Sequence, residues 1–365
     1  MNNELIKVGV THGDINGIGY ELLLKTFSDM RMSELCSTIV YGSSKVAAYY
    51  RKTLGLPAVN LNMIGKAEEA RENRLNIINS LSDEEAQVDM GTSTAQSGTA
   101  AEKSLRAAVD DLKRGVIDVL VTSPVNMQNM RSESFPYASQ QLFLQESLAA
   151  KGTLSIFINE GLRIAPAVES VAVKDITSVL TVDHLTQKLI LLNQSLKEDF
   201  NIVRPRIAVL ALNASGTDLA TTGDEEKNVI LPAMEEAERK GVMSFGPYQA
   251  DEFFGNMQYN LFDAVLAMYY DQGVAPFKAL SLDEGVVFTA GLPYICVSPN
   301  HGVLYEVTGK NECSESAFRN SFYQAIDLYR NRKSFAENTA RPLRRQYYEK
   351  GEDNEKLDLT AEEHD

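Results

Sequence analysis

Short apolar runs alternate with longer amphipathic stretches along most of the chain. The short runs end in polar loops and are typical of buried strands; they cover residues 5–10, 37–41, 116–122, 163–173, 179–182, 206–212, 264–268, 286–289 and 295–297. Segments with helical periodicity lie at residues 20–30, 45–54, 98–114, 183–200, 224–240 and 314–332, and Asp183 is placed to cap one of them. Strands separated by helices predict an α/β protein with a mostly parallel sheet and helices on both faces.

Polar loops follow four of the predicted strands, at residues 11–19, 123–128, 213–223 and 270–278. Ligands of open α/β sheets bind at the carboxyl ends of strands, so these loops are the expected site. The last loop is the most informative, because it carries Asp271, Gln272 and Gly273 and then Lys278. An acid, an amide, a glycine and a lysine after a buried strand predict a site for a charged small molecule.

The composition limits the class of protein and its location. The chain has 365 residues, 44% of them hydrophobic, which is enough for two core-bearing lobes. Its net charge of −15 disfavours nucleic acid as a partner. No apolar run approaches about 18 residues and the N-terminus lacks a basic and apolar leader, so the sequence predicts neither a membrane span nor a secretory signal. Three widely spaced cysteines, Cys36, Cys296 and Cys313, favour the reducing cytoplasm.

Several short motifs together resemble one known family. They include Gly13-Asp14 with Gly17-Ile18-Gly19, the stretch 121–126, Gly223-Asp224-Glu225-Glu226, the stretch 262–269 followed by Asp271-Gln272-Gly273, Gly291-Leu292-Pro293 and His301-Gly302. In this combination the chain resembles, from about residue 5 to residue 332, the 4-hydroxythreonine-4-phosphate dehydrogenase family of vitamin B6 synthesis.

The resemblance implies a fold, an assembly and a reaction. The fold is that of isocitrate and isopropylmalate dehydrogenases, with a cleft between two α/β/α lobes. The first lobe would comprise residues 1–130 and about 285–340, the second about 131–284 with the dimer contacts, and residues 341–365 a polar C-terminal extension. The resemblance further implies a homodimer that uses NAD and a divalent metal to oxidise and decarboxylate 4-phosphohydroxy-L-threonine in pyridoxal phosphate synthesis. A phosphorylated small molecule is therefore the expected partner.

Aligning the motifs of this chain with those of the family assigns roles to individual residues. The resemblance assigns catalysis to Asp271 and Lys278. It assigns substrate binding to Gln140, Gln141 and again Lys278. It assigns cofactor binding to Asn213, Gly223, Glu225 and His301.

The metal-binding positions depart from the family's pattern. The three metal-binding histidines of the family align with Ser170, Ser215 and Tyr270, so the sequence predicts no metal site of that kind. Carboxylates leave open a reorganised site for a hard ion such as Mg²⁺, built from residues such as Asp14, Asp218 and Asp271.

Substrate-binding positions differ as well. A lysine, an asparagine and an arginine of the family align with Met127, Val287 and Cys296. Two hypotheses from different classes stay open. The chain is an NAD-dependent dehydrogenase for the family's substrate or for another acidic hydroxy compound. Alternatively, it is a catalytically degenerate homologue that acts as a binding or regulatory protein.

Overall fold

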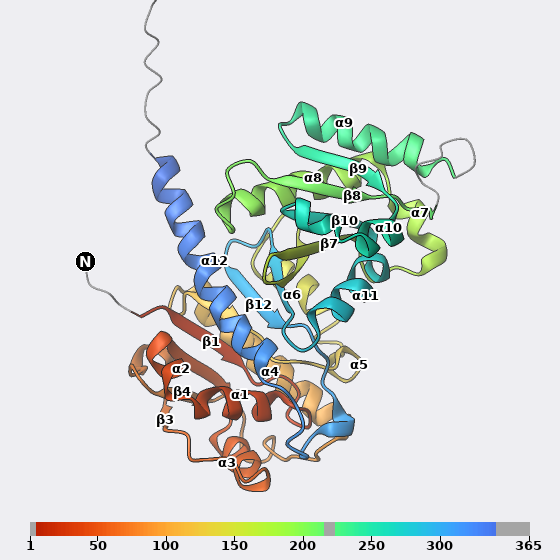
Figure 1. The fold of residues 1–365 in the computed structure, drawn as a ribbon. Coiled ribbons are helices and arrows are strands. Elements are labelled where there is room, and N and C mark those ends of the chain that lie inside the picture. The colour runs from red at the N-terminus through yellow and green to blue at the C-terminus, as the bar shows by residue number, and fades with distance from the viewer. Residues whose placement is uncertain (1–4, 215–222, 341–365) are drawn as a thin grey trace, which may run out of the picture.

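A twelve-stranded sheet runs through the described part of the chain, with helices packed on both of its faces (Figure 1). The computed structural model describes residues 5–214 and 223–340. Predictions for Ser215, for Asp218 and for the segment 341–365 fall outside these described residues. The sheet confirms the predicted α/β class, whereas the bounds of two separate lobes stay a prediction.

The strands follow one another across the sheet in an order far from their order in the chain. From one edge to the other they are β3 (Leu61–Ile64), β4 (Leu75–Asn79), β2 (Ser37–Gly42), β1 (Lys7–Thr11), β5 (Val119–Val121), β12 (Ile295–Pro299), β11 (Val286–Ala290), β6 (Leu154–Asn159), β7 (Leu162–Val168), β10 (Ala264–Tyr269), β8 (Arg206–Leu210) and β9 (Met243–Tyr248).

The direction of the strands reverses in the middle of the sheet. The sheet has two parallel halves. One consists of β3, β4, β2, β1, β5 and β12, and the other consists of β7, β10, β8 and β9. Between them, β11 is antiparallel to β12 and to β6, and β6 is antiparallel to β7. The sheet is therefore mixed. Its two parallel parts point in opposite directions, so the four predicted loops do not gather along one edge.

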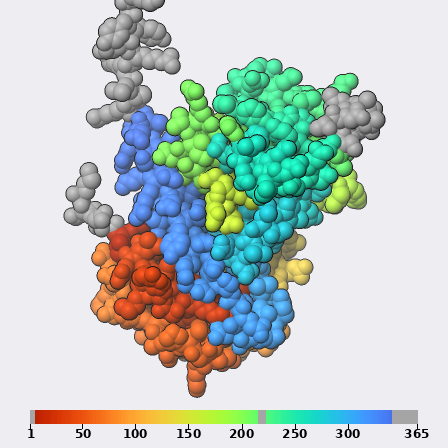
Figure 2. All heavy atoms as spheres, viewed as in Figure 1, coloured from red at the N-terminus to blue at the C-terminus, as the bar shows by residue number. Residues whose placement is uncertain are grey.

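Helices cover the sheet on both sides, which explains why strands such as β2 are buried along their whole length. The α-helices are α1 (Gly19–Ser28), α2 (Met30–Leu35), α3 (Ser44–Thr53), α4 (Ala95–Lys113), α5 (Met127–Met130), α6 (Gln140–Ser147), α7 (Ile176–Val179), α8 (Val182–Glu198), α9 (Leu231–Arg239), α10 (Ala250–Gly255), α11 (Tyr270–Ser281) and α12 (Ser316–Ala340). Helix α12 packs along β12, β5 and α8 and so joins the N-terminal and middle parts of the chain (Figure 2).

Two predictions about the segment between β7 and α8 were wrong. The strand ends at Val168, and residues 179–182 form no strand, because a 3₁₀ turn (η2, Val173–Asp175) and α7 fill the connection. Helix α8 is capped by Thr181, whose hydroxyl accepts a hydrogen bond from the backbone N–H of His184, and Asp183 lies in its first turn. Within residues 5–214 and 223–340, no helix has the length and apolar character that crossing a bilayer requires.

Candidate functional site

The candidate site is a pocket on one face of the middle of the sheet. This central pocket has a volume of about 340 Å³ and is lined by Thr122, Ser139, Gln140, Gln141, Leu144, Ser155, Phe157, Glu169, Ser170, Tyr270, Val287, Thr289, Cys296, Val297, Ser298 and Asn300. We identify it as the site because Gln140, Gln141, Ser170 and Tyr270, all singled out in the sequence, meet there.

The floor of the central pocket is formed by β12, β11 and β6. Val287 on β11 lies opposite Phe157 on β6 and Ser298 on β12, and Thr289 lies opposite Ser155. Side chains at every second position of a strand share one face of a sheet, so this register places these groups side by side. The antiparallel middle of the sheet thus produces a floor of hydroxyls around one aromatic ring.

Helix α6 supplies the two glutamines predicted to bind substrate. Its N-cap is Ser139, whose hydroxyl accepts from the backbone N–H of Leu142 at 3.3 Å. Gln141 Nε2 donates to Thr153 Oγ1 at 3.2 Å. Gln140 Oε1 is buried and has no hydrogen-bond partner among the described residues. The acceptor of Gln140 is therefore unsatisfied among the described residues.

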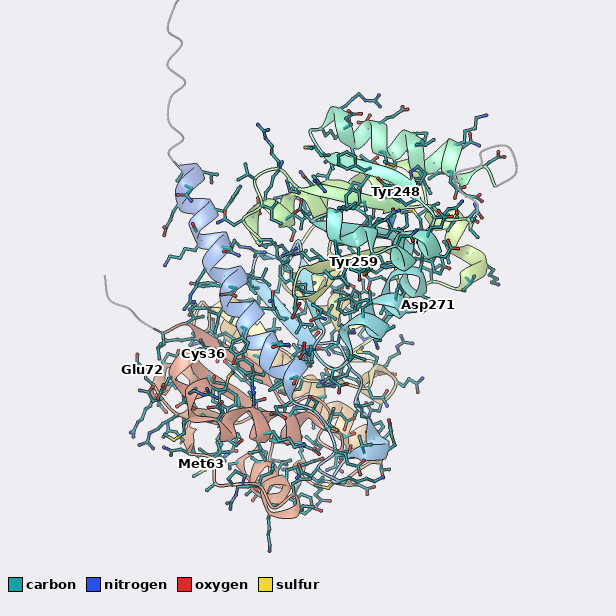
Figure 3. The ribbon with its side chains drawn as sticks, in the orientation of Figure 1. Cys36, Met63, Glu72, Tyr248, Tyr259 and Asp271 are labelled. Atoms are coloured by element: carbon teal, nitrogen blue, oxygen red, sulfur yellow. The ribbon has the colours of Figure 1, made fainter. Side chains whose placement is uncertain are left out.

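The predicted loop after β10 is a helix. Tyr269 is extended and the chain enters α11 at once, so Asp271 lies in the first turn of that helix and Lys278 in its last (Figure 3). Both side chains are exposed and neither lines the central pocket. Only Tyr270 of this stretch reaches the pocket, where its ring meets Phe157 edge to face, 5.9 Å between centroids. A catalytic role for Asp271 and Lys278 stays a prediction.

Gln272 and Gly273 connect α11 to the sheet. Gln272 Oε1 accepts from the backbone N–H of Met268 at 2.7 Å, and its Nε2 donates to the carbonyl oxygen of Ala211 at 2.6 Å. A Cβ at Gly273 would lie 2.8 Å from side-chain carbons of Ala267 and Ile164, so the helix approaches the strands too closely for a larger residue. The amide and the glycine of this motif therefore serve the fold.

Glu169 is the charged residue of the site that the sequence reasoning missed. It follows the end of β7 and accepts hydrogen bonds from Ser155 Oγ at 3.0 Å and Ser155 N at 3.4 Å. Burial raises the pKa of its carboxyl group, and these hydrogen bonds and Lys188 offset the rise in part. The available signal was its position, directly after the buried run of β7 and next to Ser170.

A second cavity continues from the central pocket. This side chamber, of about 280 Å³, shares Ser139, Gln141, Glu169 and Ser170 with the pocket and is also lined by Leu142, Gln145, Gly152, Thr153, Ala167, Val168, Val171, Val179, His184, Gln187 and Lys188. Lys188 Nζ donates to the carbonyl oxygen of Thr153 at 2.8 Å, and burial lowers the pKa of Lys188. The side chamber thus contains two basic side chains, His184 and Lys188. The described lining of the central pocket contains none.

Three of the predicted cofactor-binding residues do lie together. Asn213 donates from its backbone N–H and from Nδ2 to the buried carboxylate of Glu226, at 2.8 and 3.0 Å, and Nδ2 also reaches Glu225 at 3.2 Å. Gly223 packs so closely on Glu225 that a side chain there would collide with the carboxylate. This cluster follows β8 and lies outside the central pocket. Its role in cofactor binding stays a prediction.

His301, the fourth predicted cofactor-binding residue, follows β12. The cluster of Asn213 follows β8, which is separated from β12 by β11, β6, β7 and β10 in the sheet. Burial lowers the pKa of the His301 ring, and the charge of Lys278 lowers it further, while Asp283 opposes them. Lys278 and His301 are therefore electrostatic neighbours, although the sequence assigned them different roles.

Asp14 belongs to a closed hydrogen-bond network. Its buried carboxylate accepts from Tyr305 Oη at 2.6 Å, Asn129 Nδ2 at 2.8 Å, Ser97 Oγ at 3.0 Å and the backbone N–H of Asn16 at 2.9 Å. Four donors satisfy about the full capacity of a carboxylate. Asp14 therefore holds the N-terminal loop to the C-terminal part of the chain and is a poor candidate for the reorganised metal site.

The described residues do not fit the divalent metal of the family. They contain no group of three or more His, Cys, Asp or Glu side chains placed to hold an ion. Ser170 is a neutral hydroxyl, and burial, Glu169 and Asp271 raise the pKa of Tyr270, so its phenol is protonated at neutral pH. Neutral hydroxyls are weak ligands compared with imidazole.

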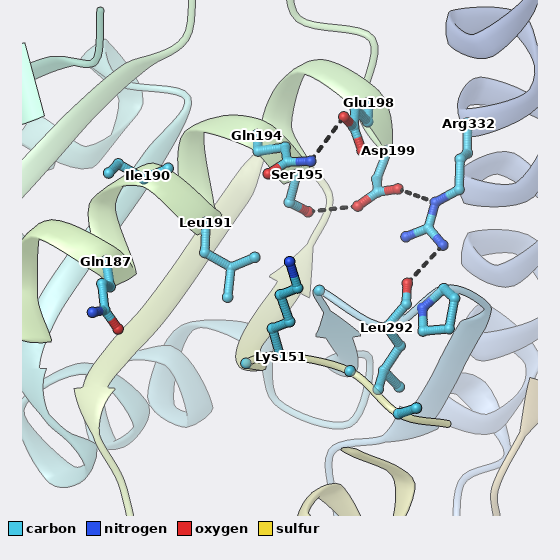
Figure 4. A pocket seen from close by; sticks show the side chains of 15 residues that line it. Lys151, Gln187, Ile190, Leu191, Gln194, Ser195, Glu198, Asp199, Leu292 and Arg332 are labelled. Atoms are coloured by element: carbon cyan, nitrogen blue, oxygen red, sulfur yellow. Dashed lines mark hydrogen bonds and ion pairs between the residues drawn. The ribbon is translucent and has the colours of Figure 1, made fainter. Parts of the chain in front are cut away.

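A larger groove lies between α8 and α12 and has about 640 Å³ of volume (Figure 4). Two of its ionic groups, Arg332 and Asp199, pair with each other. Arg332 Nε contacts Asp199 Oδ1 at 2.7 Å, Ser195 Oγ donates to Asp199 Oδ2 at 2.7 Å, and Arg332 Nη1 donates to the carbonyl oxygen of Leu292 at 3.0 Å. These contacts hold the two helices together, and no residue predicted for function lines the groove.

The fold and the polar pocket on its central strands define a small-molecule-binding α/β protein. Comparison with known proteins gives the family. A family model described as pyridoxal phosphate biosynthetic protein PdxA matches residues 34–325, and the chain belongs to this family.

Its relatives include named enzymes. The chain is 43% identical, over the full length of both, to the 4-hydroxythreonine-4-phosphate dehydrogenase of Bacteroides thetaiotaomicron. It is 33% identical to that of a Sulfurihydrogenibium species, over 90% of this chain and all of the relative. The solved 4-hydroxythreonine-4-phosphate dehydrogenase from Burkholderia phymatum superimposes with a TM-score of 0.72 at 26% identity, over 89% of this chain and 99% of that one. The family resemblance found in the sequence is thereby confirmed.

Proposed function

We propose that this member of the PdxA family binds a small hydroxylated compound in the central pocket and does not carry out a metal-assisted oxidation there. The observation that carries the proposal is the position of Ser170 and Tyr270. Both line the pocket, at two of the three positions where the resemblance places metal-binding histidines. A serine and a protonated tyrosine are much weaker metal ligands than the imidazoles.

The lining of the pocket favours hydroxyl groups on the ligand. Its polar side chains are mostly hydroxyls and amides, which donate and accept hydrogen bonds without carrying charge: Thr122, Ser139, Gln140, Gln141, Ser155, Ser170, Thr289, Ser298 and Asn300. A phosphate on the ligand stays a prediction from the resemblance. Lys188 and His184 in the side chamber are the basic side chains that would receive it.

A second candidate is the NAD-dependent oxidation after which the relatives are named. It is favoured by the 43% identity over the full length to the Bacteroides enzyme. In that case Asn213, Gly223, Glu225 and His301 would hold the cofactor, which supplies the hydride acceptor. The cofactor, a homodimer and a cytoplasmic location all stay predictions.

A turnover assay decides between these candidates. The full chain is mixed with NAD, 4-phosphohydroxy-L-threonine and Zn²⁺, Mg²⁺ or Mn²⁺ in turn, and NADH absorbance is followed, with the Bacteroides relative as positive control. We expect turnover at least about 100-fold below the control, because loss of metal-ligand support alone costs roughly 10- to 100-fold. Metal-dependent turnover close to that of the control would refute the proposal.

A variant with restored histidines tests the cause of the loss. We expect calorimetry with Zn²⁺ to show no stoichiometric binding to the wild-type chain and binding to the triple variant Ser170→His, Ser215→His, Tyr270→His. Stoichiometric binding to the wild type would show that the chain has another metal site, and the donor argument would then be wrong.

A further inference from the structure

We propose that Lys188 forms an imine with a small aldehyde or ketone that enters the side chamber, and that Glu169 supplies the proton for this step. The chamber is the cavity of about 280 Å³ that continues from the central pocket. The inference goes beyond the proposed function, which concerns binding in the central pocket and includes no covalent step. The phosphate contact that the family resemblance predicts for Lys188 is the alternative that the experiment separates from it.

The position of Lys188 is the first argument. Helix α8 brings the lysine to a chamber whose walls are partly apolar, through Leu142, Ala167, Val168, Val171 and Val179. Its Nζ donates to the carbonyl oxygen of Thr153 at 2.8 Å and makes no ion pair with a described residue. Burial lowers the pKa of Lys188, and the charge of Glu169 opposes this in part. An amine held in this way is neutral, and so nucleophilic, at a lower pH than an exposed lysine.

Glu169 is the second argument, because an imine needs an acid as well as an amine. It lines the same chamber and accepts hydrogen bonds from Ser155 only among the described residues. Burial raises the pKa of its carboxyl group, so the proton is retained to a higher pH than on an exposed glutamate. The charges of Lys188 and Glu169 shift each other's pKa, which indicates that the chamber brings the two groups near each other.

The rest of the chamber leaves this pair without a competitor. His184 is the remaining titratable side chain of the described lining, and its Nε2 contacts the carbonyl oxygen of Ala167 at 2.9 Å. The other polar side chains are neutral hydroxyls and amides: Ser139, Gln141, Gln145, Thr153, Ser170 and Gln187. They can form hydrogen bonds with a carbonyl compound but cannot replace Lys188 as its nucleophile.

The step balances with one carbonyl compound as the co-reactant and one water as the product. The lone pair of Nζ attacks the carbonyl carbon, a C–N bond forms, and the electron pair of the C=O bond moves to the oxygen. One proton passes from nitrogen to that oxygen, which gives a carbinolamine. Glu169 then protonates the hydroxyl, the C–O bond breaks and water leaves. The remaining N–H proton returns to the Glu169 carboxylate, so nothing is oxidised or reduced.

Reductive trapping tests the inference on the full chain. The protein is incubated with propanal at neutral pH and quenched with borohydride at increasing times, with propan-1-ol as the control that has no carbonyl group. Borohydride reduces an imine to a stable amine, and peptide mapping by mass spectrometry gives the rate at which each lysine gains a propyl group. We expect Lys188 to react at least about 100-fold faster than Lys151, which is exposed, because a positioned general acid contributes about that factor.

Variants assign the proton to Glu169. Glu169→Gln keeps an acceptor for Ser155 and should lower the rate at Lys188 by about 10- to 100-fold. In the wild type the rate should be level between the two pKa values, because deprotonation of Lys188 and loss of the Glu169 proton offset each other. In Glu169→Gln it should rise with pH. Glu198→Gln, a matched change on α8 outside the chamber, should behave as the wild type does. Thermal unfolding shows that each variant is folded before it is compared.

Two outcomes would overturn the inference. Labelling of Lys188 no faster than that of Lys151 would show that the amine stays charged, and it would leave Lys188 to the phosphate contact. An unchanged rate and pH profile in Glu169→Gln would remove the proton donor from the step. Both are separate from failure of the proposed function, which depends on metal-dependent turnover in the NADH assay.

Discussion

Protonation of His12 should determine how strongly acid destabilises this protein. His12 follows β1, is 1% exposed, and stacks on Tyr20 with ring centroids 5.6 Å apart. Burial lowers its pKa from 6.5 to about 4, and the nearby carboxylate of Asp14 offsets this only in part. The folded protein therefore keeps the ring neutral at pH values at which the unfolded chain has protonated it.

The sign and size of the effect follow from proton linkage. Because the pKa of His12 is lower in the folded state, the unfolded state binds more protons between pH 6.5 and about 4. The stabilisation present above pH 6.5 is thus lost as the pH falls toward about 4. One pKa unit corresponds to about 1.4 kcal/mol, so the full loss is about 3 kcal/mol. Roughly 2 kcal/mol of this should be lost between about pH 7.5 and pH 5.

Urea unfolding at these two pH values measures the effect. The chain has no tryptophan, so far-UV circular dichroism is the signal. The pH-dependent loss in free energy of unfolding should be about 2 kcal/mol smaller in His12→Phe than in the wild type. His184→Gln keeps His12 and should lose as much stability as the wild type does. An equal loss in His12→Phe and the wild type would refute the reasoning.

Two further predictions concern packing and the buried carboxylate network. Gly273→Ala should destabilise the protein by about 1–3 kcal/mol in urea, because the added methyl overlaps side chains of β7 and β10, whereas Gly255→Ala, with no heavy atom within 4 Å, should be neutral or stabilising. Equal effects of the two would contradict the close approach of α11. Tyr305→Phe removes a donor from the buried carboxylate of Asp14 and should cost about 1.5–3 kcal/mol, whereas Tyr294→Phe, whose hydroxyl makes a 3.5 Å contact at the surface, should cost little. No difference between the two tyrosines would show that other donors replace the lost one.

Elements with one strong pattern could be predicted from the sequence. Strands β1, β2 and β10 are buried on both faces and appear as continuous apolar runs. The sequence analysis did not identify β3, β4, β6 and β9. The edge strands β3 and β9 are half-exposed and show neither a continuous run nor a clean alternation, whereas β6 is a buried apolar run that the analysis overlooked. The reversal of direction in the middle of the sheet depends on which strands pair, which no local pattern records.

The candidate site could be predicted only where a motif marked it. Gln140, Ser170 and Tyr270 were found by position within motifs, and the structure brings them into one pocket. Only its place next to Ser170 marks Glu169 in the sequence, and Lys188, 19 positions further on, belongs to no motif. The two residues line one chamber because α8 packs beside β7. Tertiary packing of this kind leaves no spacing that a single sequence would reveal.

Gln272 belongs to a motif typical of this family, but its amide group has a structural role and not a chemical one. Its two hydrogen bonds join the backbones at the ends of β8 and β10 to α11, so a chain that keeps this architecture has a reason to keep the amide whatever it binds. Tyr270, two residues away, lines the pocket and packs on Phe157. Within a single turn of helix, Gln272 therefore supports the fold while Tyr270 lines the pocket, so a match to the Asp271-Gln272-Gly273 motif reports on the architecture and not on what the pocket binds.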